Sequence, residues 1–228
     1  MSIALTPSWD TPWFNKGVAY EALGSSRAAV IAYTRAIDLA PSSMGAYESL
    51  AELYVKLGLE PDAIDTYRNA LRADSSDVEV YYRLASLYEK RKDFSRAALL
   101  YAGAIARAPD DPQGYYMAGQ IEMDRLNFKR AVHFFRQAVD LDTEDAGSYN
   151  ALGEAFRGEG SKKEAQSSFE RALQCDSTFI PALRNLGALL IELGHESEGV
   201  HYYRRAAALG DSDAISFLRS RGINWDQH

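Results

Sequence analysis

The chain has 228 residues, and its 25 Lys and Arg against 32 Asp and Glu give a formal net charge of −7. This excess of acidic residues argues against an extended nucleic-acid contact, because binding to phosphates requires a basic surface. A hydrophobic content of 46% is enough for a packed core, and the single cysteine excludes an intrachain disulfide framework.

The sequence repeats itself every 34 residues without an insertion. One position of the repeat holds alanine five times and then glycine: Ala29, Ala63, Ala97, Ala131, Ala165 and Gly199. Four residues later the residue is always aromatic: Tyr33, Tyr67, Tyr101, Phe135, Phe169 and Tyr203. Three residues after that it is always alanine: Ala36, Ala70, Ala104, Ala138, Ala172 and Ala206. Residue types that recur at a fixed period in this way indicate a repeat protein.

Each repeat is predicted to contain two antiparallel helices of about 13 residues. When Asp10 is counted as position 1, apolar or small residues at positions 4, 7, 8 and 11 form one helical face, and positions 20, 24 and 27 form a second. Residues that break or cap helices separate the two faces, in chain order Gly24, Gly58, Asp93, Asn127 and Gly160. Ser161 with Glu164 has the pattern of a capping box.

The predicted elements follow in chain order. An N-terminal extension (1–9), in which Trp9 either covers the first repeat or is mobile, precedes the repeats. The six repeats occupy 10–43, 44–77, 78–111, 112–145, 146–179 and 180–213. Residues 214–228 are predicted to form a capping helix and tail, because Phe217 and Leu218 lie on one side and Arg219 on the other. Ile223 and Trp225 are expected to fold back onto the sixth repeat.

The first repeat resembles the tetratricopeptide repeat family through these residues: Trp13, Gly17, Tyr20, Gly24, Ala29, Tyr33, Ala36 and Pro41. Lys16 replaces the usual leucine, and the resemblance extends over 10–213. It implies an all-α fold, a right-handed α-solenoid of six tetratricopeptide helix-turn-helix repeats with a C-terminal capping helix. Because Glu122 stands where most repeats have an aromatic residue, the fourth repeat is expected to pack less tightly.

Stacking follows from the residues as well as from the resemblance. One helical hairpin has two apolar faces and can bury only one of them within itself, so the next hairpin must cover the other. The small residues of the repeat let the helix backbones approach each other. Ala104 and Ala138 are therefore expected to be too confined for leucine.

Residues that could support catalysis do not form a recognisable site. His195 and His201 are six residues apart, which is not the i, i+4 spacing of a helical metal pair. Cys175 is expected to be a small buried side chain, and no glycine-rich phosphate loop follows a strand. We therefore expect neither an enzyme nor a metal or cofactor site. No run approaches the roughly 18 apolar residues of a membrane span, and residues 1–8 do not resemble a signal peptide, so a cytoplasmic protein is expected.

The resemblance also implies a binding groove. In this family the first helix of each repeat lines the concave wall, and positions 2, 5, 9, 12 and 13 commonly face the ligand. Transferred to this chain, the candidate groove residues are Phe14, Glu48, Glu52, Tyr82, Glu89, Tyr116, Gln120, Met123, Asn150, Arg157 and Arg184. Tyr82 and Tyr116 share position 5 in neighbouring repeats, so we hypothesise that they project side by side as exposed aromatic residues. The hypothesis places both tyrosines at the centre of the groove with Gln120 and Met123, and the acidic residues Glu48, Glu52 and Glu89 at its flanks. The alternative is that both tyrosines only cover neighbouring helices.

The groove residues narrow the class of partner. The Lys and Asn pair with which some relatives clamp a chaperone tail is absent, and Glu48 with Glu52 would repel such an acidic tail. The asparagine ladder of the sugar-transferase relatives is also absent. We therefore expect a non-catalytic protein–protein interaction scaffold or adaptor that binds a peptide or helix segment, with no nucleic acid and no small-molecule substrate. The alternative is an accessory or assembly subunit docked on a larger multiprotein complex, either soluble or membrane-bound.

Overall fold

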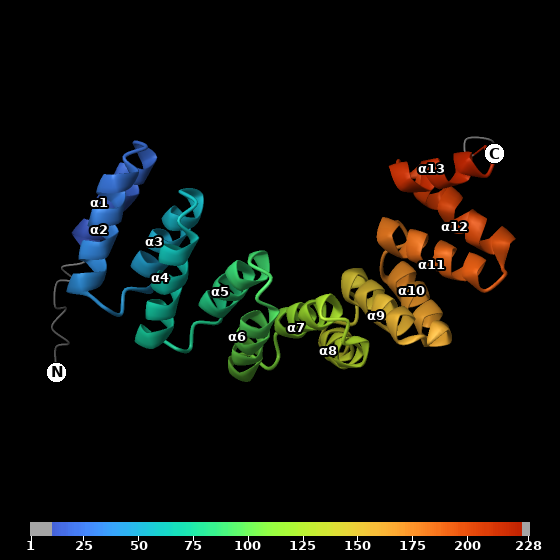
Figure 1. Cartoon of the computed structure of the whole chain (residues 1–228), viewed down its shortest axis with the longest axis horizontal. Coiled ribbons are helices and arrows are strands. Elements are labelled where there is room, and N and C mark those ends of the chain that lie inside the picture. The colour runs from blue at the N-terminus through green and yellow to red at the C-terminus, as the bar shows by residue number, and fades with distance from the viewer. Residues whose placement is uncertain (1–10, 225–228) are drawn as a thin grey trace, which may run out of the picture. The chain divides into compact units, whose positions relative to one another are not determined.

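The computed structural model describes residues 11–224, which contain thirteen α-helices and no β-strand. The all-α fold expected from the sequence is thereby confirmed. The chain divides after Ala108 into two compact units, called unit 1 and unit 2 below. In Figure 1 each unit is built from pairs of adjacent antiparallel helices. The expectation for Trp9 and the expectation for Trp225 concern positions outside the described residues.

Unit 1 contains three helix pairs. Their bounds are α1 (Thr11–Ala22), α2 (Ser26–Leu39), α3 (Met44–Lys56), α4 (Glu60–Ala73), α5 (Val78–Lys90) and α6 (Phe94–Arg107). Within this unit α2 packs against α3, and α4 packs against α5. Each pair therefore covers an apolar face of the next pair that would otherwise be exposed to water.

Unit 2 contains three helix pairs and one further helix. Their bounds are α7 (Pro112–Asp124), α8 (Phe128–Leu141), α9 (Ala146–Glu159), α10 (Lys162–Cys175), α11 (Ile180–Glu192), α12 (Glu196–Ala208) and α13 (Ser212–Ser220). The capping helix α13 begins at Ser212, two residues earlier than predicted. Its Phe217 ring stacks on Tyr203 of α12 with 3.9 Å between the ring centroids, and Leu218 is fully buried. One array of six stacked repeats would join both units and remains a prediction.

Aspartate residues cap several of the helices. The carboxylate of Asp77 accepts hydrogen bonds from the amides of Glu79 and Val80, and Asp145 caps α9 in the same way. Such caps satisfy backbone N–H groups that have no partner inside the helix. Ser161 occupies the N-cap of α10, but its side chain accepts no capping hydrogen bond. The predicted capping box is therefore wrong.

The small residues permit close contact within each helix pair. Ala104 and Ala138 are fully buried, as the repeat pattern predicts. A Cβ atom added to Gly153 would lie 2.5 Å from the Phe169 ring, so only glycine fits beside that ring.

The two helices of the last pair approach each other even more closely. A Cβ atom on Gly199 would lie 2.6 Å from the carbonyl oxygen of Gly187. The change from alanine to glycine in the sixth repeat therefore accommodates this contact between α11 and α12.

Glu122 replaces an aromatic residue in α7 and is only 1% exposed. Its carboxylate accepts a hydrogen bond from the Asn127 side-chain amide at 2.8 Å, and Arg125 and Arg130 lie 3.4 and 3.3 Å away. A polar cluster thus takes the place of the aromatic contact, because a buried carboxylate must be paired.

Candidate functional site

The aromatic residues at position 5 pack against the second helix of their own repeat. Phe14 lies 5.9 Å from Tyr33, Tyr82 lies 6.1 Å from Tyr101, and Tyr116 lies 5.7 Å from Phe135, measured between ring centroids. These distances are typical of favourable aromatic contacts. Position 5 therefore contributes to the internal packing of the repeats.

The expectation that Tyr82 is an exposed aromatic residue is wrong. Its side chain is only 9% exposed, because the ring covers Tyr101 of α6. Tyr116 is half-buried and keeps part of its ring accessible. The two tyrosines belong to different units, so their side-by-side arrangement remains a prediction.

Two glutamates at position 12 accept hydrogen bonds from tyrosine hydroxyl groups of unit 1. The Tyr33 hydroxyl donates to Glu21 at 3.0 Å, and the Tyr101 hydroxyl donates to Glu89 at 3.0 Å. Burial and the Glu21 hydrogen bond raise the pKa of Tyr33 to about 12. Burial and the nearby Glu89 charge also raise the pKa of Tyr101. Glu89, predicted to flank the groove, therefore also has a structural contact.

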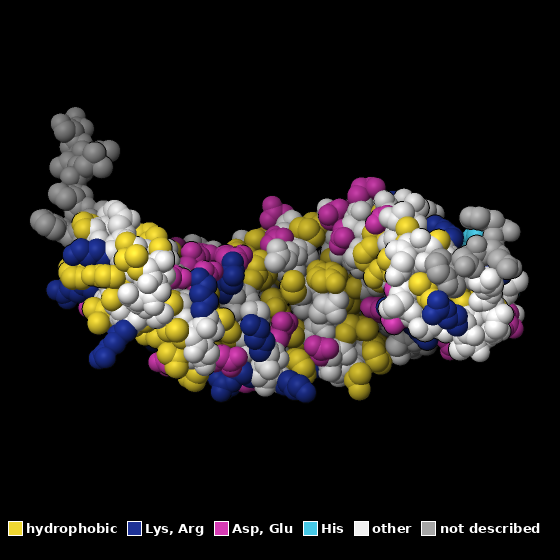
Figure 2. Space-filling model, turned by 90° about the horizontal axis from the view of Figure 1, so that it is seen from above, with side chains coloured by type: hydrophobic (Ala, Val, Ile, Leu, Met, Phe, Trp, Pro, Cys, Tyr) yellow, Lys and Arg dark blue, Asp and Glu magenta, His cyan; other side chains and the backbone are white. Residues whose placement is uncertain are grey.

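A recess lies between the first helices α3 and α5 of unit 1. It has a volume of about 330 Å³ and is lined by Glu52, Val55, Lys56, Tyr67, Arg83, Ser86, Leu87 and Lys90. Arg83 contacts Glu52 at 3.5 Å and Glu79 at 2.6 Å. Acidic and basic side chains lie next to each other over the N-terminal helices on the face that Figure 2 shows. The α3–α5 recess therefore carries both charges, whereas the sequence suggested an acidic flank.

Glu48 lies beside further carboxylates and is half-buried. Burial, followed by the charges of Asp77, Glu52 and Glu79, raises the pKa of Glu48 above its ordinary value. A cationic group of a partner would relieve this repulsion.

A second recess lies between the first helices α7 and α9 of unit 2. It has a volume of about 370 Å³ and is lined by Pro112, Gln113, Tyr116, Asp142, Asp145, Gly147 and Ser148. The side-chain amide of Gln120 donates to the Tyr116 hydroxyl at 3.0 Å and so orients the ring. Met123 is half-buried against the core of this unit.

Asn150 belongs to a polar contact between α9 and α11. It is only 7% exposed, and its side-chain oxygen accepts a hydrogen bond from the Asn185 amide at 2.9 Å. The same amide donates to Glu154 at 2.8 Å. Asn150 thus connects two neighbouring repeats, and little of it is accessible to a partner.

The two arginine candidates form ion pairs with carboxylates of other helices or turns. Arg157 lies 3.6 Å from Glu192, and Arg184 lies 3.6 Å from Asp211 and also pairs with Asp213. The side chain of Arg184 is 35% exposed and that of Arg157 is 43% exposed. Both remain accessible at the surface of unit 2.

Several charged residues of the first helices were missed by the sequence analysis. Lys56, Lys90 and Glu192 all stand at position 13, the fifth of the positions that face ligands in the family. Comparing this position across the repeats would have found them. Arg83 and Asn185 stand at position 6, and no pattern in the sequence shows that they join neighbouring first helices.

The described part of the chain, residues 11–224, lacks a cluster of metal ligands. Within that range no group of three or more His, Cys, Asp or Glu side chains could hold a metal ion. Cys175 is half-buried, and burial raises the pKa of its thiol, which keeps it in the less nucleophilic protonated form. None of the thirteen helices combines the length and the apolar character that crossing a membrane demands.

A family model described as Tetratricopeptide repeat matches residues 14–78, 48–112 and 116–178. These matches span more than half of the chain and include residues of both units. A comparison with the curated proteins gave no significant match.

Solved structures with the same fold cover most of the chain. MamA is 22% identical with a TM-score of 0.65, and the match covers 74% of this chain and 92% of that chain. YrrB, described as a TPR protein with an unusual peptide-binding site, is 21% identical with a TM-score of 0.66 and coverages of 82% and 97%. PilF of Pseudomonas aeruginosa is 16% identical with a TM-score of 0.68 and coverages of 93% and 97%. At these identities the likeness shows the fold alone.

Proposed function

The chain belongs to the tetratricopeptide repeat family, and on this premise we propose that it is a non-catalytic scaffold or adaptor that holds a segment of another protein against its first helices. The fold is typical of protein–protein interaction. The observation that carries the proposal is the recess found between successive first helices in each unit.

Both recesses offer the kind of surface that binds a peptide segment. The α3–α5 recess places the charged groups of Glu52, Lys56 and Lys90 around the apolar side chains of Val55 and Leu87. The α7–α9 recess offers the half-buried ring of Tyr116, which the Gln120 amide orients. Aromatic anchors supply binding energy and polar groups fix the register of the bound chain. The description of YrrB as peptide-binding supports the same use of the fold.

The alternative, an accessory or assembly subunit, would use the second helices more than the first. Large apolar side chains are exposed on these helices, notably Ile31 at 59% on α2 and Leu99 at 74% on α6. Their exposure favours a further protein contact on that side. This alternative is compatible with a segment bound at the first helices.

Site-specific photo-crosslinking would test the proposal. A photoreactive phenylalanine derivative is introduced at Ser86 or Gln113 in the two recesses, or at the exposed Thr34 or Glu170 on second helices. Crosslinking in living cells followed by mass spectrometry identifies the captured polypeptide. We expect a discrete partner from the recess positions. Crosslinks that form only from Thr34 or Glu170 would contradict the proposal.

Removal of the aromatic anchor Tyr116 from the α7–α9 recess gives a second test of the proposal. Tyr116→Ala combined with Gln120→Ala should weaken binding of the captured partner by roughly 2 kcal/mol, because a central aromatic contact and its orienting hydrogen bond are lost. Circular dichroism should show that the helices remain folded. Unchanged affinity in isothermal titration calorimetry would remove Tyr116 from the proposed site.

A further inference from the structure

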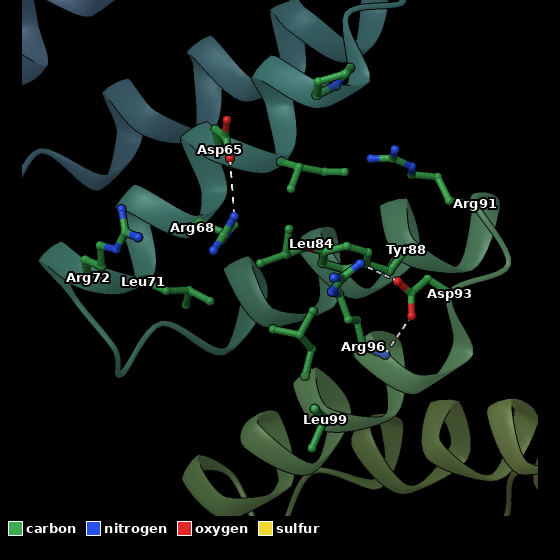
Figure 3. A pocket seen from close by; sticks show the side chains of 13 residues that line it. Asp65, Arg68, Leu71, Arg72, Leu84, Tyr88, Arg91, Asp93, Arg96 and Leu99 are labelled. Atoms are coloured by element: carbon green, nitrogen blue, oxygen red, sulfur yellow. Dashed lines mark hydrogen bonds and ion pairs between the residues drawn. The ribbon is translucent and has the colours of Figure 1, made fainter.

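A larger pocket lies among the second helices of unit 1. It has a volume of about 820 Å³ and lies between α4 and α6, with α5 as its floor (Figure 3), and is called the α4–α6 notch below. Its lining residues are Pro61, Ile64, Asp65, Arg68, Leu71, Arg72, Leu84, Tyr88, Arg91, Asp93, Arg96, Leu99 and Leu100. The notch uses side chains that the first-helix recesses do not.

The floor and one wall of the notch are apolar. Ile64 and Leu84 are buried at 5% and 2% exposure, and Leu71 and Leu100 are half-buried beside them. Leu99 lies at the edge and is 74% exposed. An exposed leucine at the mouth of an apolar pocket is a feature of protein contact sites, because covering it removes apolar surface from water.

The edge of the notch is basic. Arg68 lies 3.5 Å from Asp65 and Arg96 lies 2.6 Å from Asp93, so these two arginines are paired (Figure 3). Within residues 11–224 the Arg72 guanidinium donates one hydrogen bond, to the side-chain oxygen of Asn69 at 2.7 Å, and forms no ion pair. The lining thus holds four arginines and two aspartates, an excess of positive charge in a protein with a formal net charge of −7.

Arg91 at the notch adds to the unbalanced charge. Within residues 11–224 no carboxylate forms an ion pair with it. Arg72 and Arg91 therefore leave two guanidinium groups available for external carboxylates. Guanidinium groups bind carboxylates with paired, directional hydrogen bonds.

Unit 2 provides an internal comparison, since 68 residues separate equivalent positions two repeats apart. Its α8–α10 notch has a volume of about 440 Å³ and is lined by Arg136, Tyr149, Phe156, Glu164, Ser167, Ser168 and Arg171. Three of the four arginines correspond to acids in the sequence of unit 2, with Asp140, Glu159 and Glu164 at the positions of Arg72, Arg91 and Arg96. Of these three acids, Glu164 lines the α8–α10 notch. Ser167 and Ser168 stand at the positions of Leu99 and Leu100.

This comparison shows which residues of the notch are required by the repeat fold and which are not. The two notches are built on equivalent helices, yet Leu99, Leu100 and Arg96 of the α4–α6 notch correspond to Ser167, Ser168 and Glu164 of the α8–α10 notch. The lining of the α8–α10 notch keeps two arginines beside this one acid. A solvated face would tolerate either sign of charge. The repeat fold therefore does not require the basic, apolar character of the α4–α6 notch.

We propose that the α4–α6 notch is a second docking site, which binds a partner segment carrying at least two apolar side chains flanked by Asp or Glu. The apolar side chains cover Leu99, Leu100 and Leu71, and the acids meet Arg72 and Arg91. Charge complementarity of this kind steers and orients the partner, and burial of the leucines supplies affinity. The site is independent of the first-helix recesses, so either proposal can fail without the other.

The test uses a phage-displayed library of random 16-residue peptides selected on the full-length protein. Selected peptides are synthesised with a fluorescent label, and their affinities are measured by fluorescence anisotropy. The notch variant, Arg72→Asp/Arg96→Glu/Leu99→Ser, carries the residue types that unit 2 has at the equivalent sequence positions. The control variant, Ile31→Ser/Arg35→Glu, alters another second helix, where Ile31 holds the same repeat position as Leu99 and Arg35 pairs with Asp38.

We expect one group of selected peptides to combine paired apolar residues with Asp or Glu and to lose at least tenfold in affinity for the notch variant. The same peptides should bind the control variant like the wild type, and their affinity should fall as salt is raised. Circular dichroism should show folded helices in both variants, since the changed side chains are exposed.

Three results would overturn the proposal. The first is that no selected peptide distinguishes the notch variant from the wild type. The second is that the peptides which do so are rich in Lys or Arg. The third is a concentration-dependent dimer in analytical ultracentrifugation that the notch variant abolishes, which would identify a second copy of this chain as the occupant.

Discussion

The two units make the same helix–helix contact with different aromatic residues. At position 24 unit 1 has tyrosine in all three repeats: Tyr33, Tyr67 and Tyr101. Unit 2 has phenylalanine in its first two repeats: Phe135 and Phe169. All five rings are at most 2% exposed. The difference between the units is therefore the hydroxyl group rather than the packing of the ring.

A buried hydroxyl group needs a hydrogen-bond acceptor, which the neighbouring first helix supplies. In unit 1, Glu21 and Glu89 at position 12 accept hydrogen bonds from Tyr33 and Tyr101. In unit 2 no hydroxyl is present at Phe135, and position 12 of that repeat holds Met123. A glutamate at a ligand-facing position can thus be required by a tyrosine behind it, because a buried polar group needs a partner.

The largest expected difference between the units is a loss of stability in alkali. Burial raises the pKa values of Tyr33 and Tyr67 to about 12, whereas an unfolded tyrosine ionises near pH 10. Their contribution to the free energy of unfolding is fully present below about pH 10 and is lost as the pH rises through about 12. At about 1.4 kcal/mol per pKa unit, the loss amounts to a few kcal/mol.

Urea unfolding at pH 9 and pH 11.5 would measure this effect. The variant Tyr33→Phe/Tyr67→Phe/Tyr101→Phe, which gives unit 1 the rings of unit 2, should lose much less stability in alkali than the wild type. Tyr20→Phe is the matched control, since Tyr20 is exposed, and it should behave like the wild type. Equal losses in the triple variant and the wild type would show that the buried hydroxyls do not set the alkaline limit.

An intermediate effect, equal in both units, is expected where the repeats do not differ. Ala104 in unit 1 and Ala138 in unit 2 share position 27 and are fully buried. Replacement of either by leucine should lower the free energy of unfolding by about 1–3 kcal/mol, because the added volume separates packed helices. Thermal and urea unfolding would measure both. Wild-type stability in both variants would refute the close approach of the helix backbones.

The smallest expected effect concerns the pair of Tyr101 and Glu89. Glu89→Ala should cost about 1–2 kcal/mol of unfolding free energy, because the Tyr101 hydroxyl loses its acceptor. The double change Glu89→Ala/Tyr101→Phe should cost less than the sum of the single changes in a double-mutant cycle. Additive costs would mean that the hydrogen bond contributes little. The converse test is made in unit 2. Phe135→Tyr should lower the free energy of unfolding, and the added change Met123→Glu should restore part of it.

The positions of the helices were predictable because the same pattern of apolar and small residues recurs in each repeat. Five of the six predicted repeat starts (Met44, Val78, Pro112, Ala146 and Ile180) are the first residues of helices, and the first helix begins one residue after Asp10. Apolar periodicity fixes helices well when it recurs with a constant period. The capping box at Ser161 failed because it depends on the rotamer of one side chain, which no periodicity specifies.

The groove residues were predicted less well, because the prediction transferred positions without knowing their neighbours. Tyr82 stands at a ligand-facing position but its ring packs on Tyr101. Asn150 likewise is taken up by a hydrogen bond to Asn185. Position 13, which was not compared across the repeats, supplies Lys56 and Lys90 to the α3–α5 recess.

The sequence by itself determined the repeat length, the helix pairs and the family, because apolar spacing and small residues recur in register along the whole chain. Only the tertiary structure decided which polar and aromatic side chains are already occupied by internal contacts and which remain accessible. It also brought the arginines of α4, α5 and α6 together around one pocket. The physical reason is that periodicity encodes the face of a helix, whereas exposure, hydrogen bonding and charge balance depend on what the neighbouring repeat places opposite each residue.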